Sequence, residues 1–354
     1  MKKYISLVLT AVLFLGGSIG MLLGQKETSE SERRKLAQWS DVNLDNYEDA
    51  AEDAAMDQFP FRDALRQLKA ISEFSLFQKG DNNDFYYTDG SIGKIEYPLN
   101  ETSVNNAINK FNQIVDSYLR GTRCKVYFAI VPDKSYYLAA PNGYLAMDYD
   151  KLYAMMEAGL DMTHIDLRHL LNTDSYYATD PHWRQEKLLP VAQEILTAMG
   201  AEGGSDYTSH VCGGFKGVYY SQLGLPLPSE QLTYLTSDVL DHCTVYNQET
   251  NETLGIYDLA ALEGRDPYEM YLHGSAAYLT ITNPNATTNR ELVIFRDSFG
   301  SSIAPLLVDS YAKITLIDTR YVMPQMLRQF IQFKDQDILF LYSTLVLNSS
   351  ASLK

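Results

Sequence analysis

The chain has 354 residues, of which 45% are hydrophobic and 21% charged, and a formal net charge of -16. This apolar fraction supports one large or two modest globular domains and excludes a disordered or collagen-like chain, and 3 cysteines are too few for a disulfide scaffold. Because phosphate backbones repel so acidic a chain, we expect no binding to nucleic acid.

The N-terminal segment is apolar. Lys2 and Lys3 are followed by residues 4–24, which carry no charge and form a run long enough to span a bilayer. A secretory signal peptide is the alternative, but no small-x-small cleavage site follows Leu22-Leu23-Gly24, and no cysteine stands where a lipoprotein needs one. We therefore expect an uncleaved anchor, with residues 1–24 as cytoplasmic tip and membrane helix and the remainder outside the cytoplasm.

Beyond the anchor, residues 25–40 are polar and charged and are predicted to form a stalk, and residues 41–354 to form the main domain. Apolar residues recur at helical spacing from Asp41 to Phe77, with an interruption at Phe59-Pro60-Phe61-Arg62, which predicts two helices or one kinked helix. The segment from Gly80 to Gly93 is rich in Asn, Asp and Gly and predicts a short hairpin.

Apolar runs with the length of buried strands alternate with helical patterns in the rest of the chain. The predicted strands are Lys125–Val131, His164–Leu167, Tyr278–Ile281, Leu292–Phe295, Ile314–Ile317 and Ile338–Tyr342. The predicted helices are Asn105–Arg120, Arg184–Met199, Gly300–Tyr311 and Met323–Phe333. This alternation predicts an α/β fold with a mostly parallel sheet covered on both faces. Residues 203–290 are rich in Gly, Thr, Ser and Tyr, and we expect a β-rich inserted cap there.

The cysteines leave two possibilities open. Cys124 lies in an apolar run, which predicts a buried, inert thiol. Cys212 and Cys243 would be able to pair in an oxidising compartment, but sequence alone does not show whether they are close. No cysteine has a second cysteine or a histidine at zinc-finger spacing, so we expect no metal at these residues.

A serine follows one of the predicted strands. Leu292–Phe295 leads through Arg296-Asp297-Ser298 into a helix, which places the Ser298 hydroxyl at the carboxyl edge of a sheet, beside the backbone N–H groups of a helix start. A serine oxygen is a weak nucleophile without a general base nearby. The local pattern is equally compatible with a helix cap formed by Asp297 and Ser298.

A possible base lies earlier in the chain, in Asp180-Pro181-His182. Because Pro181 favours an extended or turn conformation, the carboxylate is able to hold one imidazole nitrogen and leave the other free to take a proton. Such a triplet also arises by chance, as a solvated Asp beside a partly buried His, and His164-x-Asp166 is a rival inside a strand. Each motif supplies what the other lacks, because Ser298 needs a base and the pair needs a group to activate.

Both motifs resemble those of a known family. Residues 179–183 (Thr-Asp-Pro-His-Trp) are similar to the D-x-H-W signature of the DHHW family, which is related to the alginate O-acetyltransferases of the SGNH-hydrolase-like superfamily, and residues 296–300 (Arg-Asp-Ser-Phe-Gly) are similar to their serine block. Further matches span nearly all of the chain after the anchor, at Ser31–Ala37, Phe59–Asp63, Val131–Ser135, Phe215–Tyr220 and Ile317–Tyr321.

The resemblance implies an SGNH-hydrolase-like three-layer sandwich in which Ser298 is the nucleophile, His182 the general base and Asp180 the group that orients it. The backbone N–H groups of Ser298 and Phe299 are then expected to form the oxyanion hole. The residues expected to support these groups from nearby are Trp183, Asp297, Arg296 and Arg320.

The chain departs from the family pattern at three places. Pro181 stands where the family has its first His, but it lies between the two matched residues and leaves the triad unchanged. Arg296 replaces the Gly of the ordinary Gly-Asp-Ser block. His273-Gly274-Ser275 stands where Gly-Asn is expected, which leaves the side-chain donor of the oxyanion hole unassigned.

The expected function is a membrane-anchored serine acyltransferase outside the cytoplasm that O-acetylates a cell-surface or exported polysaccharide through an acetyl-serine. The resemblance favours a transferase over an acetyl-esterase with the same triad, and it implies a membrane-bound acyltransferase as the acetyl donor. The acidity of the chain favours a neutral or cationic glycan as acceptor, and its 26 tyrosines suit carbohydrate.

Two other classes of protein remain as alternatives. One is a catalytically inactive module that only binds a polysaccharide. The other is a metal-dependent hydrolase built on His164, Asp166, Asp180 and His182. No Gly-rich phosphate loop and no zinc-spaced His/Glu cluster occur in the sequence, so we expect neither a cofactor nor a metal.

Overall fold

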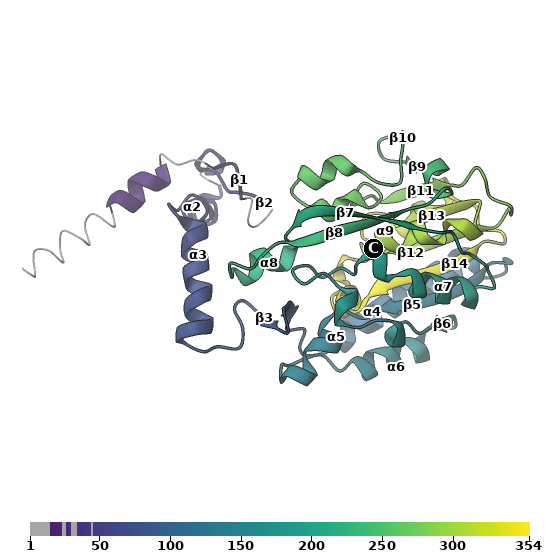
Figure 1. Cartoon of the computed structure of the whole chain (residues 1–354), viewed down its shortest axis with the longest axis horizontal. Coiled ribbons are helices and arrows are strands. Elements are labelled where there is room, and N and C mark those ends of the chain that lie inside the picture. The colour runs from purple at the N-terminus through teal and green to yellow at the C-terminus, as the bar shows by residue number, and fades with distance from the viewer. Residues whose placement is uncertain (1–14, 23–25, 30–33, 44) are drawn as a thin grey trace, which may run out of the picture. The chain divides into compact units, whose positions relative to one another are not determined.

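The computed structural model describes residues 15–22, 26–29, 34–43 and 45–354. The chain divides into two compact units (Figure 1). The N-terminal unit comprises the described residues up to Tyr86 together with Val218–Pro228, and the sheet unit comprises Tyr87–Gly217 and Ser229–Lys354.

Most of the expected membrane anchor lies outside the described residues, because only residues 15–22 of the segment 1–24 are described, as a helix. Within the described ranges, no helix is long and apolar enough to cross a bilayer. The expected stalk, residues 25–40, is described in part and contains the short antiparallel pair β1 (Thr28–Ser29) and β2 (Arg34–Lys35). The anchor and the domain boundary at residue 40 stay predictions.

The N-terminal unit contains the two predicted helices, α2 (Tyr47–Asp57) and α3 (Arg62–Ile71). The chain breaks between them because Pro60 has no N–H to donate and Phe61 adopts a left-handed backbone with φ of 60°. A short helix, α8 (Val218–Leu223), completes this unit. The predicted hairpin is also present, as β3 (Phe85–Thr88) and β4 (Ser91–Lys94), and from Tyr87 onwards it belongs to the sheet unit.

The sheet unit is built on an eight-stranded sheet with the spatial order β10-β9-β11-β13-β12-β14-β5-β6. Its strands are β5 (Lys125–Val131), β6 (Thr163–Ile165), β9 (Thr244–Asn247), β10 (Glu252–Leu254), β11 (Tyr278–Thr282), β12 (Glu291–Arg296), β13 (Lys313–Ile317) and β14 (Asp337–Ser343). The five strands from β13 to β6 are parallel to one another, and the three from β10 to β11 are antiparallel. The predicted α/β fold with a mostly parallel sheet is confirmed.

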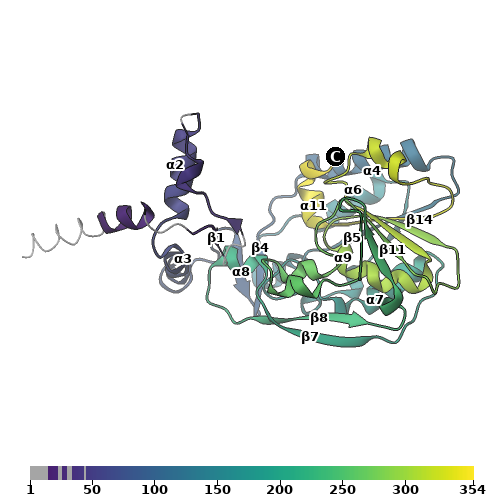
Figure 2. The same cartoon turned by 90° about the horizontal axis from the view of Figure 1, so that it is seen from above.

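Both faces of this sheet are buried, since alternate residues of its central strands enter different hydrophobic clusters. In β12, Leu292 and Ile294 belong to one cluster, while Val293 and Phe295 belong to the other. The first cluster contains residues of α7 (Leu189–Ala198) and α9 (Gly300–Ile303), and the second contains residues of α4 (Glu101–Ile114), α6 (Tyr149–Gly159) and α11 (Thr344–Asn348). Figure 2 shows these helices on the two sides of the sheet.

Several predicted helices are shorter than expected. The helix after Ser298 changes after four residues from α9 into a 3-10 helix, Ala304–Ser310, because Pro305 has no N–H to donate. The last predicted helix contains only α10 (Leu327–Phe330), preceded by a 3-10 turn. The remaining short helix, α5 (Ser135–Leu138), follows β5.

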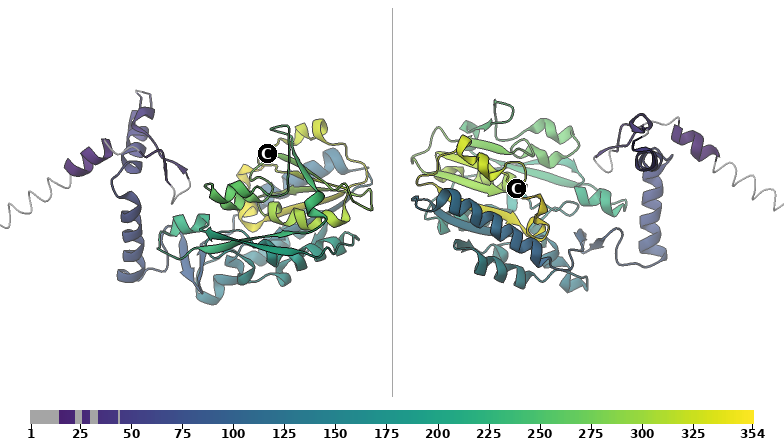
Figure 3. Two further views of the ribbon diagram at one scale, coloured as in Figure 1. Left: turned by 45° about the horizontal axis from the view of Figure 1, so that its top comes forward. Right: turned by 180° about the vertical axis from the view of Figure 1, so that it is seen from behind.

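The segment 203–290 is β-rich, as predicted, but it is not one separate cap. Its strands β9 to β11 extend the central sheet. Only β7 (Thr208–Phe215) and β8 (Glu230–Thr236) form a ribbon of their own, which is visible in Figure 3. Cys212 lies on β7 and Cys243 precedes β9, and both thiols are unpaired, as is that of Cys124.

Candidate active site

Ser298 lies in the tight turn between β12 and α9, at the carboxyl end of the parallel strands. Asp297 holds this turn, because its Oδ1 accepts from the Phe299 N–H at 3.0 Å and its Oδ2 accepts from the Ser343 N–H at the end of β14 at 2.8 Å. Gly300 starts the helix, where an added Cβ would come within 2.8 Å of the Arg296 side chain. The turn therefore needs both the carboxylate and the glycine.

The structure brings together the three residues that the sequence selected for the triad. His182 Nε2 is 2.7 Å from Ser298 Oγ, and His182 Nδ1 is 2.6 Å from Asp180 Oδ1. Because an ionised carboxylate only accepts, Nδ1 carries a proton and Nε2 is left to accept from the serine hydroxyl. The same Asp180 oxygen also accepts from the His182 backbone N–H at 3.0 Å, so the short Asp-Pro-His segment folds back on itself.

Burial suits these three residues to proton transfer. Asp180 is completely buried, His182 exposes 11% of its side chain, and Ser298 is partly exposed. The serine is therefore accessible from solvent, while the carboxylate acts on the imidazole in a water-poor environment, where electrostatic interactions are stronger. The serine turn fits both interpretations of its sequence, the helix cap and the nucleophile. Asp297 caps the turn, and Ser298 faces the imidazole.

Two charged groups, the buried Lys134 and the partly buried Glu230, hold the loop that carries Asp180. The Lys134 ammonium donates to the carbonyls of Tyr177 (2.9 Å) and Ala178 (3.0 Å). The Glu230 carboxylate accepts from the N–H groups of Ala178 and Thr179, each at 2.7 Å, and from the Thr179 hydroxyl. The positive ammonium thus binds carbonyl groups of this stretch of backbone, and the negative carboxylate binds its N–H groups.

Burial lowers the pKa of Lys134 to about 7, although the negative charges of Asp180, Glu230 and Asp133 act in the opposite direction. Gly217 closes the other side of the loop, where its N–H donates to Thr179 Oγ1 at 2.8 Å. An added Cβ at Gly217 would lie 2.2 Å from Asp180 Cβ, so only glycine fits this contact.

The imidazole of His182 contacts two aromatic rings. Tyr268 stacks on it with a centroid distance of 3.9 Å and an interplanar angle of 10°, and Phe299 packs against it at 4.9 Å and 52°. Trp183, expected near the triad, donates from Nε1 to Phe299 O (3.1 Å) and to Ser302 Oγ (2.9 Å), which ties the histidine loop to the serine helix.

The two arginines expected near the triad have different surroundings. Arg296 is buried and its terminal nitrogens contact Ser301 Oγ at 3.1 Å and the carbonyls of Asp297 and Ala276 at 3.4 Å. Burial lowers its pKa. Burial opposes the charge of Arg320 as well, but the hydrogen bonds to Asp318 prevail and raise its pKa.

The expected oxyanion donors differ in availability. The Phe299 N–H is already bound to Asp297 Oδ1, whereas no hydrogen bond from the Ser298 N–H is found among the described residues. His273, at the position of the expected Gly-Asn motif, pairs through Nε2 with the Gly255 carbonyl at 2.8 Å. Ser298 N–H is therefore the donor that this conformation leaves available.

A family model described as DHHW protein matches residues 141–317, which include every residue of the triad. The chain belongs to the DHHW family. A search of curated protein sequences returns no match.

Solved structures resemble this DHHW protein over about three quarters of its length. A DHHW family protein from Eubacterium siraeum aligns with a TM-score of 0.61 and 20% identity, covering 75% of this chain and 93% of the other. Bacillus cereus PatB1 aligns with a TM-score of 0.60 and 20% identity, covering 74% and 96%. The O-acetyltransferase domain of Pseudomonas putida AlgJ aligns with a TM-score of 0.43 and 12% identity, covering 75% and 87%. The first two establish a shared fold.

The rival metal site does not form in this DHHW protein. His164 Nδ1 pairs with Glu157 at 2.8 Å, and Asp166 pairs with Arg168 at 2.8 Å. Across the described part of the chain, no group of three or more His, Cys, Asp or Glu residues is arranged to hold a metal ion.

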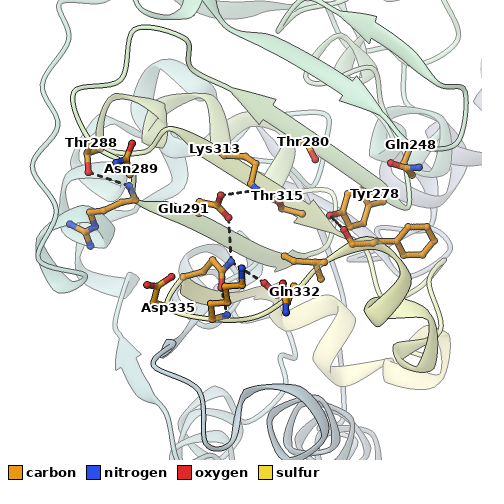
Figure 4. A pocket seen from close by; sticks show the side chains of 15 residues that line it. Gln248, Tyr278, Thr280, Thr288, Asn289, Glu291, Lys313, Thr315, Gln332 and Asp335 are labelled. Atoms are coloured by element: carbon orange, nitrogen blue, oxygen red, sulfur yellow. Dashed lines mark hydrogen bonds and ion pairs between the residues drawn. The ribbon is translucent and has the colours of Figure 1, made fainter.

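A polar hollow of about 660 Å³ lies away from the triad, at the start of β12 and β13 rather than at their carboxyl ends (Figure 4). Glu291 and Lys313 form an ion pair at 2.8 Å in it, and the Gln336 side chain donates to Glu291 at 3.2 Å. None of the triad residues lines this hollow.

Sequence reasoning missed Tyr268, Lys134 and Glu230 as parts of the site. Lys134 lies in a segment that matched the family, Val131–Ser135, but nothing in that segment indicates which carbonyls its amine binds. Tyr268 is one of 26 tyrosines and lies 86 positions from His182, so only the fold distinguishes it from the others.

Proposed function

We propose that this DHHW protein is a serine acyltransferase outside the cytoplasm, which moves an acetyl group from a membrane-bound donor to a hydroxyl group of a polysaccharide. The observation that carries the proposal is the continuous hydrogen-bonded chain from Asp180 through His182 to Ser298, with distances of 2.6 and 2.7 Å. Such a chain is the arrangement that activates a serine hydroxyl for acyl transfer.

In the first half-reaction, Ser298 Oγ attacks the acetyl carbonyl carbon while His182 Nε2 takes the hydroxyl proton. The leaving group departs with that proton, and an acetyl-serine ester remains. In the second half-reaction, the acceptor hydroxyl attacks the ester carbonyl, and His182 takes its proton and returns it to Ser298 Oγ. Asp180 stabilises the imidazolium in both steps, and the Ser298 N–H, for which no hydrogen bond is found among the described residues, is the donor assigned to the developing oxyanion.

The choice of a sugar hydroxyl rather than water as acceptor rests on membership in the DHHW family and its relation to O-acetyltransferases. The same triad serves an acetyl-esterase, so the acceptor has to be measured. The binding module without catalysis is disfavoured, because a protein that only binds glycans does not require a buried carboxylate, an imidazole and a hydroxyl in line.

Covalent labelling tests the nucleophile. A structure of Bacillus cereus PatB1 carries a sulfonyl adduct, and a sulfonyl fluoride forms a stable ester with an activated serine. We expect stoichiometric labelling of the wild-type protein at Ser298, no labelling of Ser298→Ala, and normal labelling of Ser352→Ala, which removes an exposed serine elsewhere. Labelling of Ser298→Ala at the wild-type rate, while the protein is folded, contradicts the proposal.

The acceptor is tested separately, by supplying an aryl acetate together with an oligosaccharide. Mass spectrometry of the oligosaccharide should show a gain of acetyl groups that is lost in Ser298→Ala. Release of acetate without any acetylated sugar, over a range of neutral and cationic glycans, identifies the protein as an esterase instead.

A further inference from the structure

Tyr268 belongs to the segment that interrupts the α/β pattern, yet it lies against the catalytic imidazole. It lies in a 3-10 helix, Pro267–Met270, which is capped by Asp266, whose side chain accepts from the Tyr268 N–H at 3.1 Å. The Tyr268 side chain is buried, and its ring is nearly parallel to that of His182, at a centroid distance of 3.9 Å. The imidazole edge that carries Nε2 still points at Ser298.

The Tyr268 ring is fixed to the serine helix by its hydroxyl group. Tyr268 Oη lies 2.8 Å from Ser302 Oγ, which also accepts from Trp183 Nε1 at 2.9 Å. Ser302 is on α9, four residues after the nucleophile, and Trp183 follows the catalytic histidine directly. The Ser302 hydroxyl thus links the Tyr268 ring to the segment that carries His182 and to the helix that follows Ser298.

We infer that Tyr268 is a positioning residue for the acyl transfer, with a ring face that holds the His182 imidazole in line with Ser298 and stabilises it when it carries a positive charge. This inference rests on the proposed function and names a residue outside the triad that acts through His182.

The physical basis is the charge distribution of an aromatic ring. The face of a tyrosine ring is negative and attracts a cation placed over it, and the attraction is stronger where water is excluded. His182 becomes a cation each time it takes the proton of the serine or the acceptor. Flat stacking also restricts rotation of the imidazole, which the smaller and non-planar side chain of leucine would not do.

The other charged groups around His182 and Tyr268 are the same in the wild type and in the Tyr268 variants. They are Asp180, which is hydrogen-bonded to the imidazole, and Asp297, which shares the serine turn and acts electrostatically on Tyr268. Phe299 packs on the imidazole and carries no charge. A change confined to Tyr268 therefore reports on the ring itself.

The test measures the rate of sulfonyl fluoride inactivation of the full chain as a function of pH, because this rate follows the fraction of His182 that is able to act as base. In Tyr268→Leu, the acid limb should move to lower pH by about half to one unit, and the plateau rate should fall about ten-fold. In Tyr268→Phe, which keeps the ring, both should stay close to wild type.

Tyr271→Leu is the matched control. Tyr271 packs on Tyr268 at 4.9 Å in the same tyrosine cluster but has no ring contact with His182. Its replacement should loosen the cluster without moving the acid limb. If Tyr271→Leu and Tyr268→Leu move it equally, or if Tyr268→Leu leaves it unchanged, the inference is wrong.

A second series covers the case in which Tyr268→Leu does not fold. Phenylalanines with increasing numbers of fluorine atoms at position 268 keep the ring size and weaken its negative face. The plateau rate should fall stepwise along the series, and a constant rate overturns the inference. Labelling of Ser298→Ala would instead overturn the proposed function itself, so the two failures are distinguishable.

Discussion

Asp180 is a completely buried carboxyl group, and its partners favour the charged form. Its Oδ1 accepts from the ring Nδ1–H and the backbone N–H of His182, and the Lys134 ammonium adds a favourable charge interaction. Burying an isolated charge would cost several kcal/mol, which paired hydrogen bonds offset. Under the proposed function, the charge of this residue is needed as well as its shape.

The first prediction concerns Asp180→Asn, which keeps the shape and removes the charge. The amide offers an N–H group to Nδ1 and favours the wrong imidazole tautomer, so turnover of an aryl acetate should fall by about 10³- to 10⁴-fold. Asp174→Asn, at an exposed position in the preceding 3-10 helix, Thr173–Ser175, should leave turnover unchanged. A folded Asp180→Asn protein that keeps more than roughly a tenth of the activity would exclude the assigned role.

The second prediction uses the buried amine of Lys134. Burial lowers the pKa of this amine to about 7. A lysine in the unfolded chain titrates near 10.4. Between these values the unfolded chain binds one more proton than the folded chain, so this group makes stability rise with pH, by up to about 1.4 kcal/mol per pH unit. Below about pH 7 both states are protonated, and the full cost of burying the charge is present.

Urea unfolding of the wild-type protein and Lys134→Met across this pH range isolates the effect. The free energy of unfolding of the wild type should rise relative to that of the variant from pH 7 upwards. The difference between the two should become constant above about pH 10. Lys187→Met removes an exposed lysine and should give a constant difference. A constant difference for Lys134→Met would show that its ammonium is not destabilised by burial.

At the scale of elements, the loop 177–183 is held by contacts from segments distant in sequence, and this limits what sequence reasoning reaches. Six strands of the sheet are predictable because they form continuous apolar runs such as Lys125–Val131, and Ser298 because it follows such a strand, whereas β9 and β10 were not predicted individually. Helix lengths were overestimated where Pro305 turned the chain into a 3-10 helix. The support from Glu230 and Gly217 depends on tertiary contacts that no local pattern encodes.

The third prediction tests that support with Gly217→Ala. The new Cβ would collide with Asp180 Cβ and the Thr179 carbonyl, at 2.2 and 2.4 Å, so the loop has to move. We expect a loss of about 1–3 kcal/mol in the free energy of unfolding and a fall in activity of about 100-fold from the displaced Asp180.

Gly213→Ala provides the comparison for Gly217→Ala. Gly213 lies on β7, four residues before Gly217, an added Cβ there meets no atom within 4 Å, and its φ is not left-handed. Both stability and turnover should stay close to wild type in this variant. Equal behaviour of the two variants would mean that the loop tolerates displacement and that Gly217 does not position Asp180.

At the scale of the whole molecule, the sequence indicated the class of fold but neither the strand order nor the division into two units. The order places β12 between β13 and β14, so the serine turn lies next to Ser343 at the end of β14. The crossover connections determine which strands are neighbours, and apolar runs in the sequence do not reveal these connections. The return of Val218–Pro228 to the N-terminal unit, out of a segment taken for one insertion, is likewise a tertiary feature.

Net charge is a whole-molecule property, and at -16 it shapes the choice of acceptor under the proposed function. A polyanionic polysaccharide and an acidic protein repel each other at low ionic strength, and salt screens the repulsion once the Debye length falls to about 10 Å or less. The initial rate of acetylation of a polyanionic glycan should therefore rise several-fold between about 10 and 300 mM NaCl. The carboxyl-reduced, neutral form of the same polymer should react faster at low salt and respond little to salt. A polyanion whose acetylation slows as salt is added would instead require a local cluster of lysine and arginine at the cleft that outweighs the charge of the whole chain.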